Sequence, residues 1–116
     1  MKEEFIEKYV KLCSKLDDYT EMGVKRHNRA MKELSKLYYL LSEDKHMAEE
    51  ILIILLDFDD ERIKITAATH CLGLNINLTM AEKTLNNISH KSNVPLSRFN
   101  AEMILKTWKE QGYLKF

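Results

Sequence analysis

The chain contains few of the residues that interrupt or cross-link a fold. Its 116 residues include one proline, three glycines and two cysteines, whereas 45% are hydrophobic and 31% are charged. This composition excludes a disordered chain, and the length leaves no room for a second domain. A chain of this size buries roughly two thirds of its unfolded surface, which is enough for one core without a metal or a disulfide. We therefore expect a single domain spanning residues 1–116.

The two cysteines give no sign of a disulfide framework or a zinc site. Cys13 and Cys71 lie far apart, and neither has a cysteine or histidine at the spacing of metal ligands. Two isolated cysteines suit a reducing compartment. We expect no metal and no cofactor.

Long apolar runs are also absent. The longest, Ile51 to Leu56, has six residues with a carboxylate on each side, whereas a membrane-spanning helix needs about 20. Residues 1–4 turn acidic at once, unlike a signal or transit peptide. We therefore expect a cytoplasmic protein with no membrane partner.

Motifs of catalysis are missing as well. There is no phosphate-binding loop, no dinucleotide glycine pattern and no nucleophile in a recognisable setting. His70 and Cys71 are adjacent, but neighbouring helical residues point about 100° apart and cannot work as base and thiol. His46 with Glu49 and Glu50 is better explained as a solvated helix face than as a metal site. We expect that the protein is not an enzyme.

The sequence does contain a helical period of 3.6 residues in almost every segment, without the alternation typical of strands. We therefore predict an all-α fold of about six helices. The first three are expected at about 3–20, 24–42 and 45–57, with a break at Gly23. The third is apolar on nearly all sides through Ile51, Leu52 and Leu55, and we expect it at the centre of the fold.

Capping residues delimit the other three helices. The fourth helix is expected to begin at Asp59 or Asp60 and to end at Gly73 or Asn75. The fifth should begin with a Thr79–Glu82 capping box and end at about Ser89. The sixth should begin at Pro95 and end at Gly112. Trp108 is expected to anchor the sixth helix in the core. Consecutive helices should form antiparallel pairs, arranged as a HEAT-like right-handed repeat or as a compact bundle.

One segment resembles the inner half of a HEAT repeat. Residues 56–63, followed by Ala67–Ala68 and Leu72–Gly73, combine an acidic turn, an arginine that reaches back to an acid, and small residues for close packing. By this resemblance Arg62 pairs with Asp57 or Asp59.

Three blocks extend the resemblance to nearly the whole chain. They are Lys25–Met31, Asp59–Gly73 and Phe99–Trp108, of which the last is the most specific. Together they resemble a family of small bacterial proteins catalogued as domain of unknown function twenty-nineteen. The resemblance implies a HEAT-like helical fold and a bacterial setting, and it implies no activity.

Charge is unevenly divided in this neutral chain. Residues 1–61 carry a net charge of about −5 and residues 62–116 about +5. The densest acidic segment runs from Glu43 to Glu61 and contains one base, Lys45. Most charge runs are solvated helix faces, and the functional alternative is a docking surface for a basic partner.

Three hypotheses of function follow. The favoured one is a non-enzymatic protein-binding module, such as an immunity protein that neutralises a basic toxin, and its binding residues are Glu49, Glu50, Asp57, Asp60 and Glu61. The second is a nucleic-acid-binding accessory protein that uses Lys25, Arg26, Arg29, Lys32 and Lys36, although the neutral total and the lack of a motif weigh against nucleic acid.

The third hypothesis is a small-molecule pocket between the helix pairs, with the polar His27 and Asn28 at its floor. It predicts a real cavity, whereas the first hypothesis predicts a filled core. Otherwise Asn28 is a buried amide that satisfies backbone groups of a loop, and Arg62 is likewise structural.

Overall fold

The computed structural model describes residues 2–16 and 21–112, with the backbone alone for 21–24, and these residues form six α-helices and no strand. In chain order the helices are α1 (Lys2–Cys13), α2 (Glu21–Glu43), α3 (Lys45–Leu56), α4 (Glu61–Leu74), α5 (Leu78–Lys91) and α6 (Pro95–Gln111). The predicted all-α fold of six helices is confirmed for this part of the chain. None of the described helices is long and apolar enough to cross a membrane.

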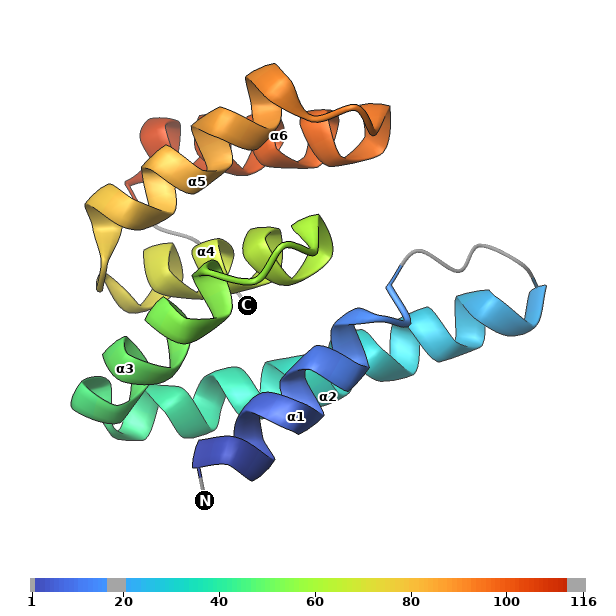
Figure 1. Ribbon diagram of the computed structural model, residues 1–116, viewed down its shortest axis with the longest axis vertical. Helices are drawn as coiled ribbons and strands as arrows, with labels where there is room; N and C mark the ends of the chain where they lie inside the picture. Colours follow the sequence, from blue (N-terminus) through green and yellow to red (C-terminus); the bar gives the residue numbers. More distant parts are fainter. Residues whose placement is uncertain (1, 17–20, 113–116) are drawn as a thin grey trace.

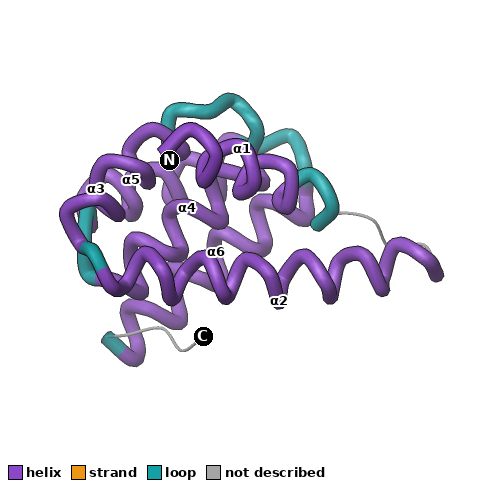
Figure 2. The backbone as a smooth tube through the Cα atoms, turned by 90° about the horizontal axis from the view of Figure 1, so that it is seen from below, coloured by secondary structure: helices purple, strands orange, loops and turns teal. Residues whose placement is uncertain are grey.

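The helices pack in chain order as three neighbouring pairs. α1 contacts α2, α3 contacts α4, α5 contacts α6, and each pair also contacts the next. Figure 1 shows the pair α1–α2 at the bottom, α3–α4 in the middle and α5–α6 at the top. After a turn of 90°, α1, α3 and α5 lie along one side and α2 lies along the opposite side (Figure 2). The fold is therefore a stack of helix pairs.

The central helix is α4, not α3 as the sequence analysis expected. α4 packs against α1, α3, α5 and α6. Its Ala67, Ala68 and Cys71 are fully buried, and these small side chains let neighbouring helices approach closely. By contrast, Ile53 and Ile54 of α3 are 41% and 45% exposed, so one side of that apolar helix faces solvent. The apolar pattern of α3 thus overstated its burial.

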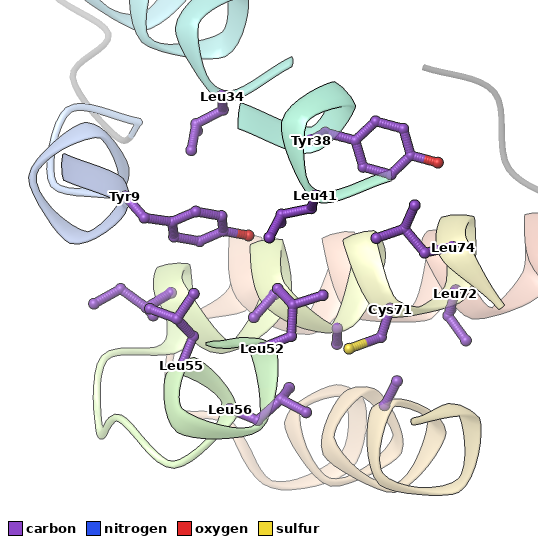
Figure 3. Packing of buried hydrophobic residues seen from close by; sticks show 14 of the residues in the cluster. Tyr9, Leu34, Tyr38, Leu41, Leu52, Leu55, Leu56, Cys71, Leu72 and Leu74 are labelled. Atoms are coloured by element: carbon purple, nitrogen blue, oxygen red, sulfur yellow. The ribbon is translucent and has the colours of Figure 1, made fainter. Parts of the chain in front are cut away.

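The hydrophobic core surrounds α4 and joins all six helices. Figure 3 shows Tyr9, Leu34 and Leu41 projecting from α1 and α2 toward Leu52 of α3. Fully burying one leucine stabilises a fold by about 1.5–3 kcal/mol, so a few such side chains exceed the net stability of a small domain. The burial expected for Ile51, Leu52 and Leu55 is confirmed, and Ala67, Cys71, Leu85 and Leu105 are buried as well. Trp108, also predicted to be mostly buried, is only partly buried, because α6 is the last helix of the stack.

Two predicted boundaries in the first third of the chain are wrong. α1 ends at Cys13, and α2 begins at Glu21, so Gly23 lies inside a helix instead of ending one. The carbonyl groups just after α1 bind side chains from other helices: Ser14 O accepts from Arg62 at 3.1 Å, and Leu16 O accepts from Nδ1 of His27. Tertiary hydrogen bonds thus replace the helical ones that would have extended α1. Residues 17–20, where the first helix was expected to end, lie outside the described residues.

The caps of α4 and α6 form as expected, and α3 is capped as well. Asp44 caps α3 through Met47 N at 3.1 Å. Asp60 caps α4, and Asn75 ends it in the left-handed conformation at φ 62°. Gly112 closes α6 at φ 73°, a value that glycine adopts without strain.

The expected capping box of α5 does not form. The helix starts at Leu78, with Asn77 at the cap position in the left-handed conformation, so Thr79 lies inside the first turn. The Asn77 side chain instead donates to Glu49 O at 3.3 Å. A contact between distant segments therefore sets this boundary.

Candidate functional site

The predicted acidic docking residues do not form one free surface, because three of the five are engaged within the fold. Glu50 binds Lys2 of α1 and lies 3.2 Å from Nε2 of His46. The hydrogen bond from Lys2 lowers the pKa of Glu50. Glu61 accepts a hydrogen bond of 2.7 Å from Ser92, which joins the start of α4 to the loop between α5 and α6.

Asp60 is the third engaged acid, and its partner corrects the predicted pairing of Arg62. Asp60 Oδ1 accepts from the backbone N–H of Arg62 at 2.9 Å and from its Nε at 3.2 Å, and Asp60 Oδ2 accepts from Nη2 of Arg62 at 2.8 Å. These hydrogen bonds lower the pKa of Asp60. Arg62 therefore pairs with Asp60, not with Asp57 or Asp59. Asp60 is the N-cap of α4 and lies two residues before Arg62, so its carboxylate is within reach of the guanidinium.

The other two predicted acids flank exposed aliphatic side chains. Glu49 and Asp57 are exposed, and Ile53 lies between them at four-residue spacing on one side of α3. Ile53, Ile54 and Met80 of α5 are 41%, 45% and 45% exposed. All three line a depression of about 310 Å³ together with Asp57. We call Glu49, Ile53, Ile54, Asp57 and Met80 the acidic–apolar face.

The sequence analysis missed the aliphatic part of this face. A run of apolar residues that covers a helix on nearly all sides indicated a central position, so no solvent-facing side was predicted for this helix. The available signal was the pair of carboxylates in line with Ile53, because charged residues one turn away on both sides mark a solvent-facing stripe.

The polar residues of α2 occupy different environments from those predicted. Asn28 is exposed, so the expected buried amide is not there. It lies on the solvent side because the helix buries Ala30, Leu34 and Leu37 on another face. His27 is partly buried and donates to Leu16 O. The basic residues proposed for nucleic-acid binding are all exposed, and they are Lys25, Arg26, Arg29, Lys32 and Lys36.

A cavity of about 360 Å³ lies between α2, α4 and α6, and we call it the α2–α4–α6 groove. Leu34, Ile65 and Ile104 line it with apolar surface, and Ser97 and Asn100 add polar groups from α6. The third hypothesis predicted such a cavity between helix pairs. Of the two residues that the hypothesis placed at the floor of the cavity, His27 lines the groove and Asn28 does not.

The buried titratable groups of the core are held in their neutral forms. His70 is 4% exposed, its Nδ1 lies 2.7 Å from the Tyr9 hydroxyl, and burial lowers its pKa to about 3. Burial raises the pKa of Cys13 and of Cys71 to about 12, so both thiols stay protonated at neutral pH. A protonated thiol is a poor nucleophile.

The described residues contain no group of three or more His, Cys, Asp or Glu side chains that could hold a metal ion. The arrangement therefore offers two surfaces for binding, the acidic–apolar face and the α2–α4–α6 groove. Comparisons of the chain with protein-family models, with curated proteins and with solved structures find no match.

Proposed function

We propose that this protein is a non-catalytic binding module that docks a basic protein on the acidic–apolar face. The observation that carries the proposal is the exposure of Ile53, Ile54 and Met80 around one depression, with Glu49 and Asp57 beside them. Protein interfaces commonly combine an apolar centre that excludes water with a charged rim. The face has both parts.

The chemistry of the face defines the partner. Two carboxylates without a basic side chain between them favour lysine or arginine, and the aliphatic centre favours an apolar side chain between those cations. A basic toxin neutralised by an immunity protein is one concrete case. The stack of helix pairs supports a binding scaffold of this kind, because small helical repeats present rigid surfaces to partners.

The experiment compares two variants of the face. Ile53→Ser with Ile54→Ser removes the apolar centre, and Glu49→Lys with Asp57→Lys reverses the rim charge. Glu102→Lys with Glu110→Lys makes the same charge reversal at exposed positions of α6. Asp60 is left unchanged, because it caps α4.

Each immobilised protein is incubated with extract of the native host, and retained proteins are identified and then purified for affinity measurement. We expect a basic protein that binds the wild type and the α6 variant with equal affinity. Both face variants should bind it at least about tenfold more weakly, which corresponds to 1.4 kcal/mol. Retention of the same partner by both face variants would show that the face is not the docking surface.

A further inference from the structure

The α2–α4–α6 groove is bordered by apolar side chains that the fold leaves exposed. Met31 of α2 lines it from one side, and Leu96 and Met103 of α6 line it from another. Phe99 lies one helical turn from both Leu96 and Met103 and extends the same surface along α6. These four side chains are between 39% and 58% exposed. Contiguous apolar surface of this kind marks an interaction site, and methionine adapts its shape to a partner.

The hydroxyl groups in the walls of the groove already have partners. Ser35 of α2 and Thr66 and Thr69 of α4 each donate to the carbonyl oxygen four residues earlier in the same helix, at 3.0, 2.8 and 2.7 Å. Hydroxyl groups bound in this way do not require a polar ligand. The groove is therefore suited to an apolar occupant.

A stripe of bases runs along α2 beside the groove. Its members lie at the i, i+4, i+7 and i+11 positions of one helix face and are all exposed, and they are Lys25, Arg29, Lys32 and Lys36. We call them the basic stripe. His27, Met31 and Ser35, which line the groove, occupy the adjacent stripe of α2. Glu33 lies 3.1 Å from Nζ of Lys36 and offsets one of the four charges. The basic stripe thus gives this flank of the groove a positive charge.

Negative charge lies at a different edge of the groove. Val94 and Ser97, at the start of α6, also line a neighbouring depression to which Asp59, Asp60 and Glu61 contribute. These carboxylates disfavour an acidic group at that edge, whereas the basic stripe favours one along α2. The charges around the groove therefore indicate which flank of an occupant is acidic.

A helix suits this groove better than an extended peptide does. The walls are α-helices, whose backbone groups bind within each helix, so an extended peptide finds no strand edge with which to pair. A helical occupant satisfies its own backbone. It can also place apolar side chains on one side and carboxylates beside them.

We propose that the α2–α4–α6 groove docks an amphipathic α-helix of a partner protein, with an acidic flank that faces α2. Apolar side chains of that helix pack against Met31, Leu96 and Met103, and its carboxylates lie beside the basic stripe. This site takes an acidic partner, whereas the acidic–apolar face takes a basic one. The inference therefore does not depend on the proposed function.

The test measures the binding of a fluorescent synthetic helix to the wild-type protein by fluorescence anisotropy. The peptide has about 20 residues, which is enough to form a helix in water, with leucine at i, i+3, i+4 and i+7 spacing and glutamate along one flank. One control peptide has glutamine in place of each glutamate. A second has the same composition in an order that spreads leucine over all sides. We expect the acidic peptide to bind at least about tenfold more tightly than either control.

Charge variants of the protein test the basic stripe. Lys25→Glu with Lys32→Glu should weaken binding of the acidic peptide at least about tenfold and should leave binding of the glutamine peptide unchanged. Lys83→Glu with Lys109→Glu makes the same charge change at exposed positions of α5 and α6 outside the groove. This control should retain the affinity of the wild type. Circular dichroism verifies that each variant is folded.

Methionine side chains locate the bound helix. Met103→Gln should weaken binding severalfold, whereas Met80→Gln makes the same change on the acidic–apolar face and should not. With ¹³C-labelled methionine methyl groups, the acidic peptide should shift the signals of Met31 and Met103 more than that of Met80. These controls separate this site from the docking of a basic protein.

The proposal is wrong if the acidic peptide does not bind or if its glutamine form binds equally. It is also wrong if a folded Lys25→Glu, Lys32→Glu variant keeps the affinity of the wild type, or if the Met80 signal shifts as much as that of Met103. A single-stranded RNA of about 15 nucleotides is the last comparison. If it binds more tightly than the acidic peptide and the same charge variant loses it, the basic stripe belongs to nucleic acid instead.

Discussion

Burial of His70 makes the stability of this fold depend on pH. Burial lowers the pKa of His70 from 6.5 to about 3, so between these values the unfolded chain binds a proton that the folded chain excludes. His70 therefore contributes its full stability above about pH 6.5, and this contribution falls as the pH drops toward 3. The loss should approach about 1.4 kcal/mol per pH unit.

Urea unfolding at several pH values between about pH 7 and pH 5 measures the slope of the free energy of unfolding against pH. Most carboxylates titrate below this range, so they contribute little to the slope. His70→Gln should flatten it. His90 is exposed, so His90→Gln should retain the slope of the wild type. Equal slopes in the wild type and in His70→Gln would show that another group causes the pH dependence.

Trp108 carries a polar atom that the fold leaves unsatisfied. Its indole Nε1 is buried and has no hydrogen-bond partner among the described residues. Trp108→Phe removes this N–H and keeps most of the apolar contact, so we expect the free energy of unfolding to stay the same or to rise by up to about 1 kcal/mol. Trp108→Ala should instead cost about 3–5 kcal/mol. Thermal or urea unfolding of both variants separates the two contributions, and a loss above 2 kcal/mol in Trp108→Phe would contradict this account.

At the scale of one element, α3 has two sides that its sequence does not distinguish. Leu55 is fully buried, whereas its neighbour Ile54 is 45% exposed. Leu55→Ala should lower the free energy of unfolding by about 2–5 kcal/mol through lost burial and a cavity. Ile54→Ala should cost less than Leu55→Ala, about 1 kcal/mol, because 45% of the Ile54 surface stays exposed in the fold. Urea denaturation of the matched pair tests the orientation of α3, and equal losses would mean that the helix is rotated from the position described.

For the whole molecule, the separation of charge affects association more than folding. The N-terminal half of the sequence is acidic by about the amount that the C-terminal half is basic. The acidic–apolar face lies mainly on α3, within the acidic segment. A basic partner is therefore attracted over distances longer than a contact.

This attraction gives the proposed complex a characteristic salt dependence. The association rate should fall steeply as the Debye length shortens from about 30 Å at 0.01 M to about 8 Å at 0.15 M salt. The dissociation rate should change less, because the apolar contacts of Ile53 and Ile54 are not screened. Stopped-flow or biosensor kinetics with the purified partner measure both rates. An association rate independent of salt would place the interface away from the acidic segment.

Local pattern was sufficient to predict the helices and most of the core. The 3.6-residue period indicated six helices, and the cap residues Asp60, Asn75 and Gly112 were among those predicted. These features depend on residues within one or two turns of each other. The family resemblance, the biochemical function and the partner stay predictions.

Tertiary structure decided the features that depend on distant residues. The end of α1 depends on Arg62 and His27, which bind carbonyl groups that a longer helix would have used. The central position belongs to α4 because its small side chains allow close approach, which apolar content alone does not reveal. The groove exists because α2, α4 and α6 pack at a separation that no single helix encodes, and so the candidate binding sites follow from how the helices pack.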